Sequence, residues 1–217
     1  MAAAQTNLRV GTWVYASPLR PAWSTAWEAH SLSVLTGVAS RWASAPGGRG
    51  SRMSFCELGM PVLPPRERLA TVRETVARLR DLDGPHAHTP VVMAVRGPKA
   101  QALAVEVADT VTFAASASDT REQIAAMARD FRAVRDVELA LHVSVVGDTV
   151  APFMASARDT DPAALRAADS LAVLPDDPAA AAEEVQRRRE EIGYSYFVLG
   201  AGSADVLAPM VTKLAGQ

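Results

Sequence analysis

A buried strand that leads straight into a helix is the feature that most limits how this chain can fold. Residues 91–95 (VVMAV) form a continuous apolar run, which is typical of a parallel strand covered on both faces. The turn 96–99 follows, and its Pro98 favours the start of a helix. The free N–H groups of that first turn, with Arg96 and Lys99 beside them, predict an anion site. The alternative is an ordinary strand-to-helix connection that carries two solvated basic residues.

The same alternation of strand and helix continues along the chain. Apolar and β-branched runs predict strands at residues 8–16, 38–45, 91–95, 110–113, 137–146 and 194–199. Helical periodicity and capping residues predict helices at residues 17–35, 66–80, 98–107, 120–132, 177–189 and 203–214. A further helix is predicted to begin at residues 161–162. Strands that alternate with helices in this way indicate one α/β domain over residues 1–217, built on a parallel sheet.

The first helix carries a stripe of large side chains. Trp23, Trp27, His30 and Val34 follow one another at spacings of four, three and four residues, which places them on one helical face. We expect this stripe to pack on the sheet.

Composition excludes several classes of protein. A formal net charge of −2 and the lack of a dense basic stripe argue against nucleic acid as a partner. Cys56 is the only cysteine, so an intrachain disulfide is impossible. No signal-peptide pattern and no charge-free run of membrane-spanning length is present. We therefore expect a cytoplasmic protein that does not enter a membrane.

Several segments together resemble the bacterial luciferase-like monooxygenase family, including its deazaflavin-dependent branch. Residues 8–12 resemble the family's third strand, and residues 27–37 resemble the helix that follows it. Residues 59–69 resemble the loop and helix after the fourth strand, and residues 90–100 resemble the fifth strand with its turn. Residues 189–199 resemble the last strand. The resemblance implies a TIM-barrel-like (β/α) fold with its site at the carboxyl ends of the strands. It covers nearly the whole chain.

The chain also departs from the family pattern. On this resemblance it would begin at the family's third strand, so we expect the first two β/α units to be absent and the barrel to be incomplete, with about six parallel strands. The family's usual catalytic His or Trp therefore has no counterpart, and the catalytic residues stay unknown. Residues 36–50 also differ from the family's apolar fourth strand. Two strand edges, near Leu8 and Tyr194, would be left open. They could pair with each other in a smaller barrel, be masked by residues 1–7 and 46–65, or be covered by a second chain, and we expect a homodimer.

Positions at the carboxyl ends of the strands give the candidate cofactor-binding residues, because such positions converge on one face of a barrel. They are Tyr15, Ser17, Arg49, Gly50, Arg96, Gly97, Lys99 and Phe113. Arg96, Gly97 and Lys99 would hold the cofactor phosphate. Tyr15 and Phe113 could flank an isoalloxazine ring.

The resemblance implies an oxidoreductase or monooxygenase that uses FMN or an 8-hydroxy-5-deazaflavin on a small organic substrate. The sequence does not choose between the two cofactors. The alternative is a truncated family member without catalytic activity or cofactor, which serves as a structural subunit or binding protein. A third reading is that the sequence omits a real N-terminal portion.

Other polar residues have simpler interpretations. His86 and His88 lack a third nearby ligand, so we predict no metal site. His30 is expected to be a packed or partner-facing histidine, and His142 to point either into the barrel or toward the helices. The charged run 183–191 is expected to be a solvated helix face.

Overall fold

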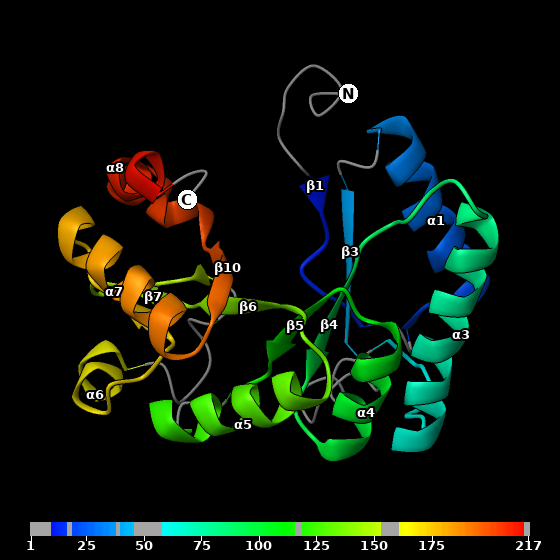
Figure 1. Cartoon of the computed structure of the whole chain (residues 1–217), viewed down its shortest axis with the longest axis horizontal. Coiled ribbons are helices and arrows are strands. Elements are labelled where there is room, and N and C mark those ends of the chain that lie inside the picture. Colours follow the sequence, from blue (N-terminus) through cyan, green and yellow to red (C-terminus); the bar gives the residue numbers. More distant parts are fainter. Residues whose placement is uncertain are drawn as a thin grey trace. The chain divides into compact units, whose positions relative to one another are not determined.

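The computed structural model describes residues 10–16, 19–37, 40–45, 58–115, 119–152 and 161–214 (Figure 1). The chain divides into two compact units, residues 1–111 and 112–217. Strand β5 (Thr110–Phe113) is cut by this boundary. The expectation of one domain stays a prediction, and each unit is described by itself below.

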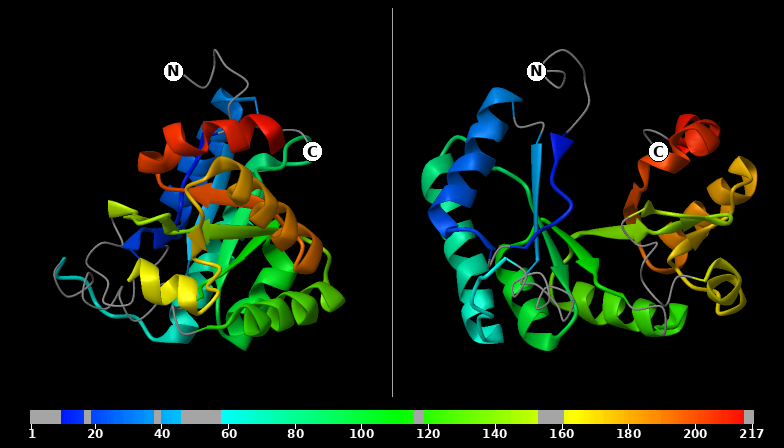
Figure 2. Two further views of the ribbon diagram at one scale, coloured as in Figure 1. Left: turned by 90° about the vertical axis from the view of Figure 1, so that its left-hand side faces the viewer. Right: turned by 180° about the vertical axis from the view of Figure 1, so that it is seen from behind.

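The first unit is a parallel sheet covered by helices. Its elements are β1 (Val10–Gly11), β2 (Tyr15–Ala16), α1 (Ala22–Leu35), β3 (Ser40–Ala45), α3 (Pro65–Asp83), β4 (Val91–Val95), α4 (Pro98–Val107) and the start of β5. Strand β3 pairs in parallel with β1, β2 and β4, with Trp42 opposite Val91. Helices α1 and α3 lie side by side (Figures 1 and 2).

The core of the first unit lies between these two helices and strands β3 and β4. It contains small and branched side chains around one indole ring: Ala26, Ala29, Trp42, Val76, Leu79 and Val91. The amphipathic pattern of the helix expected over residues 66–80 predicts an apolar face that carries Val76 and Leu79. Both are buried, so that prediction is confirmed.

The predicted packing of the tryptophan stripe is wrong. Trp23 is 67% exposed and Trp27 is 59% exposed, and Val34 is exposed as well. Helix α1 instead buries its small residues Ala22, Thr25, Ala26, Ala29 and Ser33. Small side chains let the helix lie close to α3 and the sheet, and the large stripe is left on the outside.

The second unit combines a parallel strand pair with a small separate sheet. Its elements are the end of β5, α5 (Arg121–Val134), β6 (Glu138–Val143), β7 (Val145–Val146), β8 (Thr149–Val150), α6 (Pro162–Ala167), β9 (Val173–Leu174), α7 (Pro178–Glu191), β10 (Tyr194–Leu199), η4 (Ala201–Ser203) and α8 (Ala204–Leu214). Strands β6 and β10 are parallel neighbours. Strand β7 pairs with β8 antiparallel and with β9 in parallel, which the sequence did not predict.

Local sequence signals locate several elements closely. Helix α4 has the predicted bounds, and α5, whose helix was expected from residue 120, begins with a capping box between Thr120 and Gln123. Asp161 and Asp177 cap α6 and α7, each followed by Pro. Of the single strand expected over residues 8–16, the described residues 10–16 form two short strands, separated by a segment with a cis peptide bond between Trp13 and Val14.

Candidate functional site

The turn after β4 presents an exposed arginine and an open glycine. Arg96 and Gly97 are both exposed, and Gly97 precedes the first turn of α4 with φ −90° and ψ 163°. A Cβ added at Gly97 would have no atom within 4 Å, so this backbone has open space beside it. Gln101 Nε2 donates a hydrogen bond to the Arg96 carbonyl at 3.0 Å, which ties the turn to the helix.

Lys99 lines a groove that does not include the open backbone at Gly97. Its side chain is part of the wall of a groove of about 780 Å³ between α3 and α4, together with Arg66 and Leu103. Arg96 and Gly97 do not line this groove. Arg96 and Lys99 therefore do not line this groove together.

Phe113 is a core residue of the second unit. Its ring is 6% exposed and meets the ring of Phe131 edge to face, with centroids 6.2 Å apart. Phe131 belongs to α5, so the ring of Phe113 packs toward this helix. This contact accounts for the apolar side chain at the end of β5 without a ligand.

The remaining predicted site residues are only partly described. The backbone of Tyr15 in β2 lies opposite Ser44 in β3, which places Tyr15 beside the carboxyl end of that strand. Nearby, the Thr12 hydroxyl donates to the Ala43 carbonyl at 3.1 Å and accepts from the Ala43 amide at 3.0 Å. The predicted residues Ser17, Arg49 and Gly50 lie outside the described residues.

His30 and Asp83 join the two neighbouring helices of the first unit. His30 Nδ1 lies 2.9 Å from the Asp83 carboxylate, which is buried and also accepts bonds from the Thr89 amide and hydroxyl, each at 2.8 Å. Burial opposes ionisation of Asp83, but these hydrogen bonds and the charge of Arg80 outweigh it and lower the pKa of the carboxyl. Of the two roles expected for His30, packed or partner-facing, this contact fits the packed one.

The other histidines make no metal site that the structure describes. His88 Nε2 lies 2.8 Å from Asp109 Oδ1 at the surface. No group of three His, Cys, Asp or Glu side chains suited to a metal ion occurs among the described residues. His142 is half-buried in β6, and burial lowers the pKa of its imidazole.

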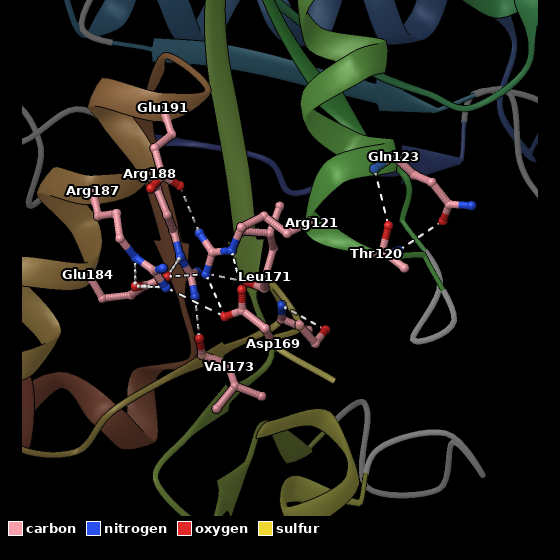
Figure 3. Close-up of polar contacts among 12 residues, drawn as sticks. Thr120, Arg121, Gln123, Asp169, Leu171, Val173, Glu184, Arg187, Arg188 and Glu191 are labelled. Atoms are coloured by element: carbon pink, nitrogen blue, oxygen red, sulfur yellow. Dashed lines mark hydrogen bonds and ion pairs between the residues drawn. The ribbon is translucent and has the colours of Figure 1, made fainter. Parts of the chain in front are cut away.

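A cluster of charged side chains in the second unit joins α5 to α7 (Figure 3). Arg121 donates to the Asp169 carboxylate at 2.6 and 2.8 Å and to Glu184 Oε1 at 2.7 Å. Arg188 donates from Nε to the same Glu184 oxygen at 2.5 Å and from Nη1 to the Leu171 carbonyl at 2.8 Å. Glu184 therefore holds the guanidinium groups of two helices together.

The centre of this cluster is buried, whereas the sequence predicted a solvated helix face here. Arg188 is 1% exposed, and burial lowers the pKa of its guanidinium, although arginine stays protonated. Burial alone would raise the pKa of Glu184, but hydrogen bonds from Arg121 and Arg188 lower it. The expected solvated face over 183–191 is thus wrong for these two residues. Their three- and seven-residue spacing from buried Ala181 was the available signal.

A cavity of about 450 Å³ lies beside this cluster. In its wall, Arg166 donates to the Gly147 carbonyl and to Asp148, each at 2.7 Å. Arg187 in the same wall donates to Glu184 at 2.7 Å. The arginines that line the cavity are thus satisfied by groups of the protein, and we assign the cluster a structural role.

The fold matches that of known enzymes although the sequence does not. No family model and no curated protein sequence matches this chain. Similar solved structures include the coenzyme F420 dependent tetrahydromethanopterin reductase from Methanopyrus kandleri, with a TM-score of 0.63 and 14% identity over 94% of this chain and 81% of that one. Another is the EDTA monooxygenase from Chelativorans sp. BNC1, with a TM-score of 0.65 and 11% identity over 98% and 76%. A third is the monooxygenase RslO1 from Streptomyces bottropensis, with a TM-score of 0.64 and 14% identity over 98% and 79%.

These proteins are members of the luciferase-like monooxygenase family. The chain has the luciferase-like fold. The predicted α/β, TIM-barrel-like class is therefore confirmed. In barrels of this class, active sites lie at the carboxyl ends of the strands, where Arg96 and Gly97 follow β4. Among the described helices, none is long and apolar enough to cross a membrane.

Proposed function

We propose that the protein is an oxidoreductase or monooxygenase that acts on a small organic substrate with FMN or an 8-hydroxy-5-deazaflavin. The solved structures that share its fold include a coenzyme F420 dependent reductase and a riboflavin lyase with a modified FMN. The single observation within this chain that carries the proposal is the exposed Arg96-Gly97 turn at the carboxyl end of a buried parallel strand. A cytoplasmic location is part of the proposal and rests on the sequence alone.

The residues of this turn fit the phosphate end of such a cofactor. Arg96 supplies a guanidinium, whose planar fork suits phosphate oxygens. Gly97 leaves open space, so a phosphate can approach the backbone there. When bound, the isoalloxazine or deazaflavin ring would supply the redox chemistry, and the protein would position the ring and shield it from water. Lys99 and Phe113 are not needed for this role.

Comparison of FMN with riboflavin tests this assignment, because the two ligands differ only by the phosphate. We expect Arg96→Ala to weaken FMN binding about tenfold or more and to leave riboflavin binding unchanged. Arg78→Ala is the matched control, since Arg78 is an exposed arginine on α3 whose partner is Glu74. Equal FMN affinity in Arg96→Ala and wild type would remove Arg96 from the phosphate site.

The second candidate function is a non-catalytic member of the fold, acting as a structural subunit or binding protein. It is favoured by the packing of Phe113 against Phe131 and by the position of Lys99 in the α3–α4 groove, which leave fewer of the predicted residues for a cofactor. This candidate predicts that neither FMN nor the deazaflavin binds.

We also propose a homodimer formed through α1. Its exposed stripe carries Trp23 and Trp27, and the stripe continues to Val34. Trp27 and Val34 are seven residues apart, which is the repeat of a helix-packing seam. Two exposed indole rings on one helix face are a typical anchor of a protein–protein interface. The sequence predicted a dimer that covers open strand edges. The dimer proposed here forms through the exposed face of α1 instead.

A further inference from the structure

The groove between α3 and α4 combines unpaired positive charge with an apolar floor. Its lining contains the positive side chains Arg66, Arg73 and Lys99 and the single negative side chain Glu74. We infer that this groove binds an amphipathic anion, a small molecule with a carboxylate or phosphate head and an aliphatic tail. The inference concerns an outer groove of the first unit and does not depend on the proposed cofactor.

The head of the ligand would lie at the first turns of the two helices. Arg66 is the second residue of α3 and Lys99 is the second residue of α4. Within the described part of the chain, neither side chain has a hydrogen bond or an ion pair, and both are exposed. Two cations that face one groove without an ion pair favour an anion there, because Glu74, the one acidic residue of the lining, pairs instead with Arg78.

The floor and far end of the groove define where the tail would lie. Leu69, Ala70 and Leu103 line it one turn below the two cations. Seven residues beyond Arg66 and Lys99, Arg73 of α3 forms an ion pair with Glu106 of α4, with Nη2 3.0 Å from Oε1. At the rise of an α-helix, seven residues span about 10 Å. Arg73, which lines the groove, is therefore paired at a point about 10 Å along the helices from the two cations.

This layout favours an amphipathic ligand over a simple ion. A free inorganic anion would meet Arg66 and Lys99 but would leave the apolar floor exposed to water. An alkylammonium would place a positive head beside two cations. The groove volume of about 780 Å³ lies within the range of small-molecule sites. An aliphatic chain with an oxyanion head is the class that satisfies both the charges and the floor.

Calorimetric titration and amide shift mapping of the full chain with four probes test the inference. We expect octanoate and octyl phosphate to bind and to shift amides of α3 and α4. Inorganic phosphate should bind much more weakly, and octylammonium should give no saturable shift. The relative strength of octanoate and octyl phosphate distinguishes a carboxylate head from a phosphate head.

Substitutions locate the head and tail. Lys99→Gln and Arg66→Gln should each weaken octyl phosphate binding about tenfold, and Ala70→Glu should weaken it by a similar factor through the floor. Arg129→Gln, at an arginine of α5 in the other unit, is the matched control and should bind as wild type does. Equal binding by wild type and the Arg66→Gln/Lys99→Gln double variant, or equal binding of octylammonium and octanoate, would overturn the inference. The probes contain no flavin, so this experiment tests the groove separately from the proposed cofactor site. A protein that binds no flavin can still bind octyl phosphate in the groove.

Discussion

Phe113 at the end of β5 packs edge to face against Phe131 of α5, with ring centroids 6.2 Å apart. Both rings are buried, so this pair stabilises the second unit. We expect Phe113→Ala to lower the free energy of unfolding by about 3–5 kcal/mol, because it opens a cavity beside Phe131. Urea unfolding measures this loss. If Phe113 instead flanks a cofactor ring, a folded Phe113→Leu variant will lose cofactor affinity and keep its stability.

The buried arginine of α7 should be essential for stability. Arg188→Met removes the donor to the Leu171 and Val173 carbonyls and leaves Glu184 with less positive charge around it. We expect a loss of about 3–5 kcal/mol in unfolding free energy, as for other broken buried pairs.

Arg187→Met is the matched control for this loss. Arg187 is half-exposed and pairs with the same Glu184, so its replacement should cost no more than about 1 kcal/mol. Similar losses in the two variants, measured by denaturant unfolding at one pH, would contradict the structural role of Arg188.

Stability should depend on pH through Asp83. Hydrogen bonds from Thr89 and His30 keep the folded-state pKa of this carboxyl below its ordinary value. The contribution of a lowered carboxyl pKa is complete above the unfolded-state pKa of about 3.9 and is lost as the pH falls toward the folded-state pKa. We therefore expect Asp83→Asn to be less stable than wild type at neutral pH, and this difference to shrink as the pH falls below the unfolded-state pKa.

Unfolding free energies at several pH values check this convergence. Asp81→Asn, at an exposed position of the same helix, should follow the wild-type curve throughout. A constant difference between Asp83→Asn and wild type down to about pH 3 would show that Asp83 titrates normally in the folded protein.

The exposed face of α1 should control the oligomeric state. We expect the wild-type protein to be a dimer and Trp27→Glu to be a monomer, because a charge in the seam disfavours helix packing. Light scattering coupled to gel filtration distinguishes the two. Val134→Glu, at another exposed apolar residue, should remain dimeric. A monomeric wild type would remove the proposed interface.

Local sequence signals predicted much of the fold because short-range physics sets these elements. The bounds of α4 follow from Pro98, and the start of α5 follows from the reciprocal bonds of Thr120 and Gln123. The buried strand β4 was evident from its continuous apolar run. These features depend on residues within one turn or one strand, so the sequence alone contains them.

Long-range packing was less predictable. Periodicity placed Trp23 and Trp27 on one face, but only the close approach of α1 to α3 decided that the small face is buried. The sequence predicted a solvated Arg188, because the Leu171 and Val173 carbonyls that accept its hydrogen bonds are distant in the sequence. In the candidate site, the sequence predicted the position of the turn that contains Arg96, between β4 and α4. It did not predict that Lys99 lines a groove with residues of α3, because that contact is long-range.

Titration of the purified protein with FMN and with an 8-hydroxy-5-deazaflavin, followed by absorption spectroscopy, tests the proposed function most directly. Binding of either cofactor should perturb its visible band and saturate at one equivalent per chain. The proposed function predicts saturable binding of one of the two, weakened by Arg96→Ala. Binding of neither, by a protein that unfolds cooperatively and is therefore folded, would contradict it and favour the non-catalytic alternative.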